Sequence, residues 1–428
     1  MSTNVLVVGS GAREHALIWK LAASNRIGQL FCTPGNAGTS LLSENLIAKA
    51  TDFDALTREI EARGIDLVVV GPEDPLARGL ADHLQARGHL VFGPTAAGAR
   101  IESSKMWAKE IMVAKGVPVG HAVACNSLQA ALDAVYDAPL PLVIKADGLA
   151  AGKGVVICET RAEAEATVRA FMSGADNALG DAADAILVEE FLEGMEVSFL
   201  AITDGTTVLP LTPACDYKRA YDNDLGPNTG GMGAYTPSAA VDRDLVHRMI
   251  DEIIVPTVAG MSERGIIYHG VLYAGMMLTT SGPKVLEFNC RFGDPETQVI
   301  LPMLDADLVG LCEATARGEL AAFPALDWFP GACVGVVLAS GGYPGDYTTG
   351  HPITGLDAVP DNGIVFHAGT TRRGDDVVTA GGRVLTCVAR GETIGDARDL
   401  AYATARAISF DGVQYRTDIA LRELVGDG

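Results

Sequence analysis

Short apolar runs alternate with amphipathic segments over the first hundred residues, and each apolar run has the length of a β-strand. The expected strands are Val5–Val8, Leu30–Cys32, Leu67–Val70 and Leu90–Phe92. Between the second and third of them, Asp52 is placed to cap a helix that ends at Gly64. Repeated strand–helix units predict a parallel sheet with helices on both faces. We therefore expect an N-terminal α/β domain over residues 1–102.

The pattern of apolar positions changes after this point. The next predicted elements are a helix that begins at Ser103, two strands joined by a glycine-rich loop over 141–157, a helix capped at Thr160 and ending at Gly174, and a strand over 185–190. Thr160 and Glu163 have the spacing of a capping box. We expect residues from about 121 to 190 to form a small lid within a middle domain that spans 103–328.

The rest of the middle domain and the C-terminal part are rich in predicted strands. The elements are a hairpin that turns at Asp204-Gly205, a glycine-rich loop at 226–233, a helix over about 242–264, and a hairpin over 271–290 that turns at Ser281-Gly282. Three further strands and an amphipathic helix over about 394–408 predict a C-terminal α+β domain, 329–428. The expected fold class is a multidomain α/β and α+β protein, whose middle domain consists of two α+β subdomains.

Charge and composition narrow the range of partners. The chain has 428 residues, a net charge of −22 and no basic block, a balance that repels nucleic acid and anionic membranes. No apolar run approaches the roughly 18–20 residues of a membrane span, and no signal-peptide pattern opens the chain. The eight cysteines stand singly, which is typical of reduced core thiols in a cytoplasmic protein. We expect small-molecule substrates and neither a nucleic-acid nor a membrane partner.

The stretch VLVVGSGAREHAL, residues 5–17, runs from a strand through Gly9 and Gly11 into a helix. A dinucleotide fingerprint requires a third glycine where the helix packs on the strand, and that position is Glu14. An acidic residue for an adenosine ribose is also missing after the second strand. The loop therefore argues against NAD. Two interpretations remain open, a phosphate monoester held at the helix N-terminus and a purely structural tight turn.

Two later stretches carry charged residues at the ends of apolar strands. In IKADGLAAGKG, Lys145 ends an apolar strand and Lys153 follows in a glycine-rich loop that lacks the Walker A pattern. This arrangement suits a lid over a polyphosphate, the alternative being an exposed loop with solvated lysines. In LVEEFLEG, Glu189 ends another strand. A carboxylate there could accept from an adenine amino group, although a single acidic residue is more often merely solvated.

KVLEFNCRFGDPETQ is the most informative stretch. On a strand over Leu286–Arg291, alternation predicts that Glu287, Asn289 and Arg291 share one face. It predicts that the opposite face, with Leu286, Phe288 and Cys290, is buried in a core. A carboxylate and an amide two residues apart are hard oxygen ligands for Mg²⁺, and an arginine adds a fork for a carboxylate or phosphate. The alternative is a solvated strand face.

With these stretches in view, the chain resembles the ATP-grasp ligases and, among them, the phosphoribosylamine–glycine ligase family. The matching stretches are GSGAREHA, PGNAGT, VGPEDPL, FGPT, IKADGLAAGKGV, VEEFLEG, GPNTGGMGAY, EFNCRFGDPETQ and SGGYPGDY, which span nearly the whole chain in family order. The resemblance implies ATP-dependent joining of glycine to 5-phosphoribosylamine through a glycyl phosphate, in purine synthesis. It also implies that the first loop binds a sugar phosphate, and we expect a monomer.

The resemblance further implies a set of nucleotide-binding and catalytic residues. Those expected to hold ATP phosphates are Lys105, Lys145, Gly152, Lys153 and Gly154. Adenine would be read by Glu189 and the backbone of Leu192, and the ribose by Glu196. Mg²⁺ or Mn²⁺ would be held by Glu287 and Asn289. The residues expected at the reacting groups are Arg291, Lys145, Lys153 and Asp294.

It implies two substrate sites as well. The sugar phosphate would be bound near Gly11, Arg13 and Asn36, with Glu73 on the sugar hydroxyls. Glycine would be bound by Asp216, Thr229, Gly230 and Gly231. The chain departs from the usual pattern in two places, since Ala12 stands where a glycine is common, and YAGMML has no acidic residue for a second metal.

Three other functions stay open on the sequence alone. Another ATP-grasp carboxylate–amine ligase, or a formyl or carboxy transferase of purine synthesis, would use a different carboxylate or amine. A nicotinamide oxidoreductase is disfavoured by Glu14. A non-catalytic nucleotide-binding module would bind ATP without forming ADP in a glycine-dependent way.

Overall fold

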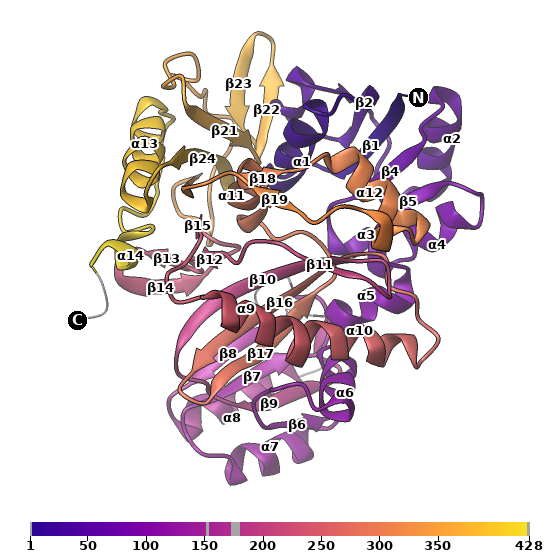
Figure 1. The fold of residues 1–428 in the computed structure, drawn as a ribbon. Coiled ribbons are helices and arrows are strands. Elements are labelled where there is room, and N and C mark those ends of the chain that lie inside the picture. Colours follow the sequence, from indigo (N-terminus) through magenta and orange to yellow (C-terminus); the bar gives the residue numbers. More distant parts are fainter. Residues whose placement is uncertain (1, 151–153, 173–179, 426–428) are drawn as a thin grey trace.

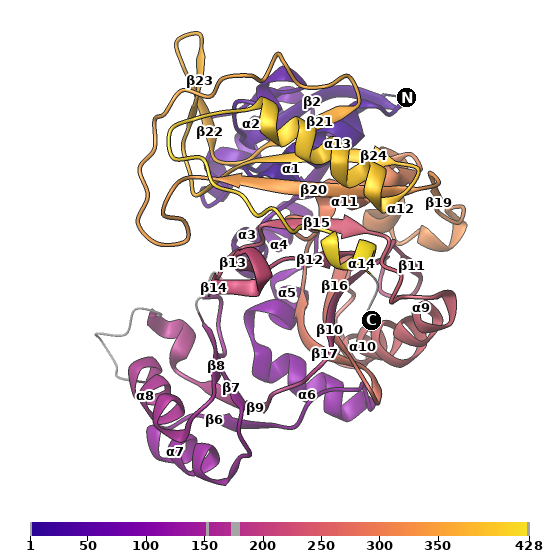
Figure 2. The ribbon, with the colours of Figure 1, turned by 90° about the vertical axis from the view of Figure 1, so that its left-hand side faces the viewer.

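The computed structural model describes residues 2–150, 154–172 and 180–425. Figure 1 shows the N-terminal and C-terminal regions side by side at one end of the molecule and the lid at the other, with the sheet that contains β10, β16 and β17 between them. Figure 2, which shows the molecule turned by 90°, shows that the lid is joined to the rest of the chain near α6 and β9. This arrangement places the lid opposite the N-terminal and C-terminal regions.

The N-terminal region is a five-stranded parallel sheet in the order β3-β2-β1-β4-β5. Its strands are β1 (Thr3–Gly9), β2 (Ile27–Pro34), β3 (Glu44–Asn45), β4 (Leu67–Val70) and β5 (Leu90–Phe92). Its helices are α1 (Ala12–Ala22), α2 (Phe53–Arg63), α3 (Glu73–Ala77), α4 (Leu80–Gln85) and α5 (Ala96–Ser103). Val7 of β1 belongs to the same hydrophobic cluster as Leu17 of α1, whereas Leu6 belongs to the cluster of Leu56 of α2. The predicted parallel sheet with helices on both faces is therefore confirmed.

The lid is an antiparallel four-stranded sheet in the order β6-β9-β7-β8. Its elements are β6 (Ala122–Cys125), α7 (Leu128–Asp137), β7 (Leu142–Ala146), β8 (Val155–Cys158), α8 (Arg161–Phe171) and β9 (Ile186–Glu190). The predicted capping box is present, because Thr160 accepts from the Glu163 amide and Glu163 accepts from the Thr160 amide. The predicted helix end at Gly174 lies outside the described residues. The lid has a hydrophobic core of its own, built around Ile144, Val168 and Val188.

The middle sheet is antiparallel, in the order β11-β10-β16-β17. Its strands are β10 (Met195–Thr203), β11 (Val208–Pro210), β16 (Gly270–Thr279) and β17 (Gly282–Asn289), so both predicted hairpins are confirmed. The predicted long helix is present as α9 (Arg243–Met249), a π-helical segment (Ile250–Ile254) and α10 (Val255–Ser262). The predicted start at Ser103 is wrong by two residues, because α5 ends there and Ser104 caps α6 (Lys105–Lys115) by accepting from the Trp107 amide.

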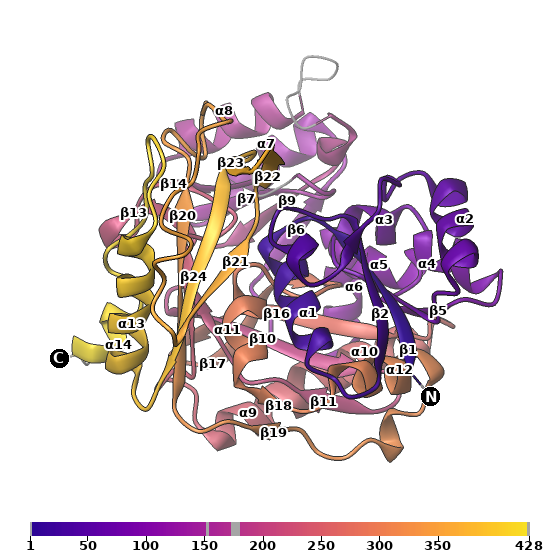
Figure 3. The ribbon, with the colours of Figure 1, turned by 90° about the horizontal axis from the view of Figure 1, so that it is seen from above.

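The C-terminal sheet has the order β12-β15-β20-β24-β21. Figure 3 shows β20, β24 and β21 of this sheet side by side. Its strands are β12 (Cys215–Asp216), β15 (Gly233–Thr236), β20 (Ala332–Ala339), β21 (Gly363–His367) and β24 (Arg383–Gly391). Helices α11 (Glu296–Met303) and α13 (Ile394–Ala407) contact β20 and β24. Two of the five strands thus come from the middle of the chain. The domain limits at 102 and 328 stay a prediction.

The remaining elements are short pairs and helices at the surface of these sheets. They are β13 (Arg219–Tyr221) with β14 (Leu225–Asn228), β18 (Leu304–Asp305) with β19 (Asp327–Trp328), β22 (Thr370–Arg373) with β23 (Asp376–Thr379), α12 (Leu308–Arg317) and α14 (Leu421–Val425). All eight cysteines are free and buried, as the sequence predicts. Across the described part of the chain, none of the helices combines the length and hydrophobicity that crossing a membrane requires.

Candidate active site

β17, at one edge of the middle sheet, carries the predicted acid and amide, Glu287 and Asn289, and the predicted arginine follows just beyond its end. Its pairing with β16 contains a β-bulge, since Gly275 lies opposite Glu287 while Met276 lies opposite Val285. The predicted strict alternation is therefore wrong at one position, because Val285 and not Leu286 joins the core with Phe288 and Cys290. The bulge leaves Leu286 outside the core, and its carbonyl oxygen accepts from Lys145 Nζ at 2.8 Å.

Arg291, just beyond β17, is held by two carboxylates from the N-terminal region. Its Nε donates to Glu73 at 3.2 Å, and its Nη2 donates to Glu102 and to Asn289 Oδ1, each at 3.1 Å. Burial would lower the pKa of Arg291, but Glu102 and Glu73 outweigh it and raise the pKa. The guanidinium is thus permanently charged and fixed in direction. Glu102 did not stand out in the sequence; it is buried, and burial raises the pKa of its carboxyl group.

Glu14 explains why the first loop lacks the third glycine of a dinucleotide site. Its carboxylate accepts from the Gly11 amide at 2.6 Å and from Arg13 Nε at 2.6 Å. A side chain on Gly71, at the end of the neighbouring strand β4, would overlap this carboxylate. Glu14 therefore occupies space beneath the loop and fixes the Arg13 guanidinium. Asn36 Nδ2 donates to the Ser10 carbonyl oxygen at 2.9 Å, which joins the second predicted loop to the first.

The first loop meets the end of β17. Nη1 of Arg13 lies 3.2 Å from the Phe292 carbonyl oxygen, and Nη1 of Arg291 lies 3.3 Å from the same oxygen. A Cβ built on Gly11 would lie 3.3 Å from Asp294 Oδ2. Residues that the sequence analysis placed at the sugar phosphate and at the reacting groups are thus brought together.

Three lysines gather where the lid meets the middle sheet. Lys145 Nζ lies 2.8 Å from Glu189 Oε2, and Lys109 Nζ lies 2.9 Å from Glu189 Oε1. Burial would raise the pKa of Glu189, but the charges of Lys145 and Lys109 outweigh it and lower the pKa. Lys105 Nζ donates to the Gly148 carbonyl oxygen of the lid loop at 3.1 Å. Lys109 was not identified from the sequence, although it lies four residues after Lys105 on the same helix.

The other residues predicted to bind the nucleotide belong to the lid loop and to the segment that follows the lid. Gly152 and Lys153 lie outside the described residues. The Gly154 carbonyl oxygen accepts from the Ala146 amide at 2.8 Å and closes the base of the loop. Leu192 is buried in the segment that joins the lid to the middle sheet.

A second charged cluster is centred on Lys218. Lys218 pairs with Glu196 and, at 3.3 Å, with Asp216. Burial would lower the pKa of Lys218, but these carboxylates outweigh it and hold the pKa well above its usual value. Glu287 adds to this effect. Burial lowers the pKa of Lys105, and the charge of Glu287 opposes this lowering without cancelling it. Glu287 is therefore close to a lysine of each cluster.

Buried hydroxyl groups extend the second cluster. Tyr273 donates to Glu296 at 2.6 Å, and Ser198 donates to the same carboxylate oxygen at 3.0 Å. Burial, followed by the charge of Asp216, raises the pKa of Glu296. The predicted loop lies against this cluster, since Thr229 Oγ1 donates to the Lys218 carbonyl oxygen at 2.9 Å. Lys218, Tyr273 and Glu296 were missed because most of their contacts, such as that of Lys218 with Glu196, join residues that are remote in the sequence.

The metal prediction fits the donor types present. Glu287 supplies carboxylate oxygens and Asn289 an amide oxygen, which are hard ligands suited to Mg²⁺ or Mn²⁺. Among the described residues, no group of three or more acidic, histidine or cysteine side chains is placed to hold a metal ion. Two protein ligands are typical of a Mg²⁺ site that is completed by phosphate oxygens and water.

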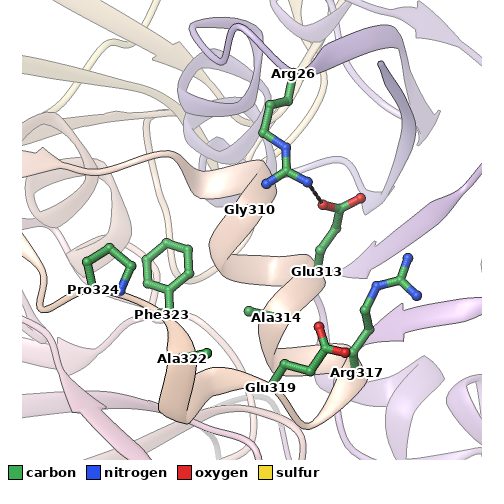
Figure 4. A pocket seen from close by; sticks show the side chains of 9 residues that line it. All are labelled: Arg26, Gly310, Glu313, Ala314, Arg317, Glu319, Ala322, Phe323 and Pro324. Carbon is green, nitrogen blue, oxygen red and sulfur yellow. Dashed lines mark hydrogen bonds and ion pairs between the residues drawn. The ribbon is translucent and has the colours of Figure 1, made fainter. Parts of the chain in front are cut away.

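A pocket of about 250 Å³ lies apart from these residues, between the N-terminal region and α12 (Figure 4). Arg26 pairs with Glu313 across it, and Phe323 and Pro324 line its far side. None of the predicted site residues lines this pocket, so it forms no part of the candidate site.

Known proteins match the chain along nearly its whole length. The family model described as "Phosphoribosylglycinamide synthetase, N domain" matches residues 3–102, the "ATP-grasp (A) domain" model 103–297, and the "C domain" model 333–422. A protein named phosphoribosylamine–glycine ligase from Pseudomonas aeruginosa is 47% identical over 425 residues, covering 98% of each chain. One of the same name from Yersinia pestis is 48% identical over 427 residues, covering 98% of this chain and 99% of that one.

Solved structures agree with these sequence matches. The crystal structure of a phosphoribosylamine–glycine ligase from Thermotoga maritima is 34% identical, with a TM-score of 0.85, and covers 98% of this chain and 100% of its own. The biotin carboxylase domain of a 2-oxoglutarate carboxylase from Hydrogenobacter thermophilus, in complex with MgADP, shares the fold at 17% identity, with a TM-score of 0.74 and coverage of 97% and 92%. The chain belongs to the phosphoribosylglycinamide synthetase family of ATP-grasp ligases.

Proposed function

We propose that this chain uses ATP to join glycine to 5-phosphoribosylamine, giving glycinamide ribonucleotide, ADP and phosphate. One observation carries the proposal. Arg13 of the first loop and Arg291, just beyond β17, both donate to the Phe292 carbonyl oxygen. This contact supports a sugar-phosphate site that adjoins a phosphoryl-transfer site. Membership of the family and the names of its curated members agree with this reaction.

In the first step, an oxygen of the glycine carboxylate attacks the γ-phosphorus of ATP, and the bond to the β,γ-bridging oxygen breaks. ADP leaves, and glycyl phosphate forms. This chemistry needs positioning and charge neutralisation more than a protein nucleophile. We assign Lys105, Lys145 and Lys153 to the phosphates, and Arg291 to the transferred phosphoryl group.

In the second step, the amine of phosphoribosylamine attacks the acyl carbon, phosphate leaves, and the nitrogen loses a proton. We assign Gly11, Arg13 and Asn36 to the sugar phosphate, and Asp294 to the edge of the reacting groups. Lid closure excludes water, which otherwise hydrolyses an acyl phosphate.

The adenosine and glycine sites are assigned to the two charged clusters, those around Glu189 and Lys218. Glu189 and the Leu192 backbone would contact adenine, and Glu196 the ribose. The glycine site would combine Asp216 with the loop that contains Thr229, Gly230 and Gly231.

Glu73, which supports Arg291, would also accept from the sugar hydroxyls. Glu287 and Asn289 would hold Mg²⁺ or Mn²⁺, which neutralises phosphate charge when bound. A monomeric state and a cytoplasmic location stay predictions.

The direct test is a coupled assay for ADP in which each substrate is omitted in turn. We expect ADP formation to require ATP, glycine and phosphoribosylamine together. Formate and bicarbonate, each offered in place of glycine, should give no ADP. ADP formation with either of them, or ADP formation that is indifferent to glycine, would contradict the proposal.

A further inference from the structure

Arg383 belongs to the C-terminal region, yet its guanidinium lies in the candidate glycine site. It stands at the start of β24, and its Nη1 donates to the Gly230 carbonyl oxygen at 2.6 Å. The same nitrogen lies 2.9 Å from the Asp294 carbonyl oxygen and 3.3 Å from Asp294 Oδ1. One side chain therefore connects the loop after β14 with the segment after β17, although neither lies near it in the sequence.

A second group from the C-terminal region holds the same loop. The Gly230 amide donates to the Tyr343 hydroxyl oxygen at 3.0 Å. The two polar backbone groups of Gly230 are thus both satisfied from outside the loop. The next residue, Gly231, has a φ of +109°, a conformation that favours glycine. Such a segment loses much conformational freedom when it is ordered, and these two contacts oppose that loss.

Asp294 is fixed on a second side as well. Its Oδ1 accepts from Gln298 Nε2 at 2.7 Å, and Gln298 is fully buried in α11. The carboxylate lies beside Gly11, where a sugar phosphate would add further negative charge. The positive charge of Arg383 offsets the charge of Asp294 at this position.

We propose that Arg383 is a positioning residue for the amino-acid substrate, which fixes the loop at 229–231 and the Asp294 carboxylate in the geometry that binds glycine. The proposal rests on the proposed function, because it takes glycine as the substrate of this loop. Tyr343 contributes to the same positioning through Gly230. In this arrangement the C-terminal region takes part in substrate binding without touching the substrate.

The test compares KM values in variants of the full-length protein. We expect Arg383→Gln to raise KM for glycine about 10-fold or more, with KM for ATP changed less than about twofold, because the lysine cluster is untouched. Arg383→Lys should recover part of the loss, and Tyr343→Phe should give a smaller rise.

The matched control is Arg398→Gln. Arg398 also donates to two carbonyl oxygens of the C-terminal region, those of Thr417 and Ile419, and neither bond reaches the loop at 229–231. We expect its KM for glycine to stay within about twofold of the wild-type value. An equal rise in KM for glycine in both variants would mean that the effect is not specific to the loop that Arg383 contacts, and it would overturn the proposal.

Hydrogen exchange gives a readout that needs no turnover. In the protein without substrates, the amides of residues 229–233 should exchange faster in Arg383→Gln than in the wild type or in Arg398→Gln. Unchanged exchange together with an unchanged KM for glycine would overturn the proposal. If the wild-type protein formed ADP with a carboxylate other than glycine, the proposed function would fail, while the exchange result would still report on the loop.

Discussion

The ammonium group of Lys109 lies 2.9 Å from a carboxylate oxygen of Glu189. The other oxygen of Glu189 lies 2.8 Å from Lys145, so two cations share one anion and a positive charge remains. Without Lys109, Glu189 and Lys145 would neutralise each other. In our interpretation, Lys109 preserves the charge that Lys145 presents to ATP.

We therefore expect Lys109→Met to raise KM for ATP about 10-fold, equivalent to about 1.4 kcal/mol, while KM for glycine changes little. Lys115→Met is the matched control, because Lys115 ends the same helix and pairs at the exposed surface with Glu263. Initial rates at varied ATP measure the effect. Similar KM values for ATP in both variants would remove the role assigned to Lys109.

Replacing either cation at the predicted transferring phosphoryl group should slow turnover strongly. For Arg291→Ala and Lys145→Ala we expect kcat to fall by roughly 10²–10³, or about 3–4 kcal/mol of transition-state stabilisation. Arg248→Ala removes an arginine from an exposed helix and serves as the control. The thermal unfolding of each variant must be measured together with its rate, because Arg291→Ala also leaves Glu102 buried without its cation and so lowers the stability of the fold. Near-normal turnover in both variants would remove the assignment.

Glu287 should control the metal requirement. Even partners outside the first ligand shell affect metal affinity by about 10–100-fold. We expect Glu287→Gln to raise the Mg²⁺ concentration for half-maximal activity at least about 10-fold. Glu252→Gln, on the surface of the long helix, should leave it unchanged. Titration with Mn²⁺ in place of Mg²⁺ compares the two ions, and an unaltered metal dependence in Glu287→Gln would count against a ligand role.

Stability should depend on pH through a buried histidine pair between α1 and β21. The His367 amide donates to His15 Nδ1 at 2.8 Å, so that nitrogen must be unprotonated. Burial, with the neighbouring His367, lowers the pKa of His15 to about 3, and burial, with Arg372, lowers the pKa of His367 to about 4.

The unfolded chain therefore binds more protons than the native protein once the pH falls below about 6.5, and stability is lost on acidification at up to about 1.4 kcal/mol per pH unit for each histidine. Urea unfolding between pH 7.5 and 5 measures this loss. His15→Asn should weaken the pH dependence, whereas His247→Asn, at an exposed position, should not. Equal pH dependences would contradict the interpretation.

The sequence alone predicts those helices and strands whose pattern of apolar and turn residues is local. Four of the five parallel strands of the N-terminal sheet, both hairpins and the helix at 394–407 follow from apolar periodicity and turn residues, whereas the two-residue strand β3 was not predicted. The misplaced helix start at Ser103 came from two adjacent serines, of which the second is the cap. The face of Leu286 was misassigned because a bulge depends on pairing with another strand, which no local pattern encodes.

In the candidate site, too, some residues could be predicted from the sequence and others could not. Glu287, Asn289 and Arg291 stand out because a strand places them on one face. Lys145, Lys153 and Glu189 stand out at strand ends and in a glycine-rich loop, and the resemblance supplied the remaining assignments. The residues that were missed are Glu102, Lys109, Lys218, Tyr273, Glu296 and Arg383. Each of these acts through a contact that only the tertiary fold creates, such as that of Arg383 with Asp294.

The C-terminal sheet joins strands that are made at different times during synthesis. β15 ends at Thr236, but its partner β20 begins only at Ala332. At about 5–20 residues per second, the nascent chain waits several seconds on the ribosome with the β15 edge unpaired. A ribosome stalled between these two strands would therefore carry a middle region with an open edge, available to chaperones or to a neighbouring nascent chain.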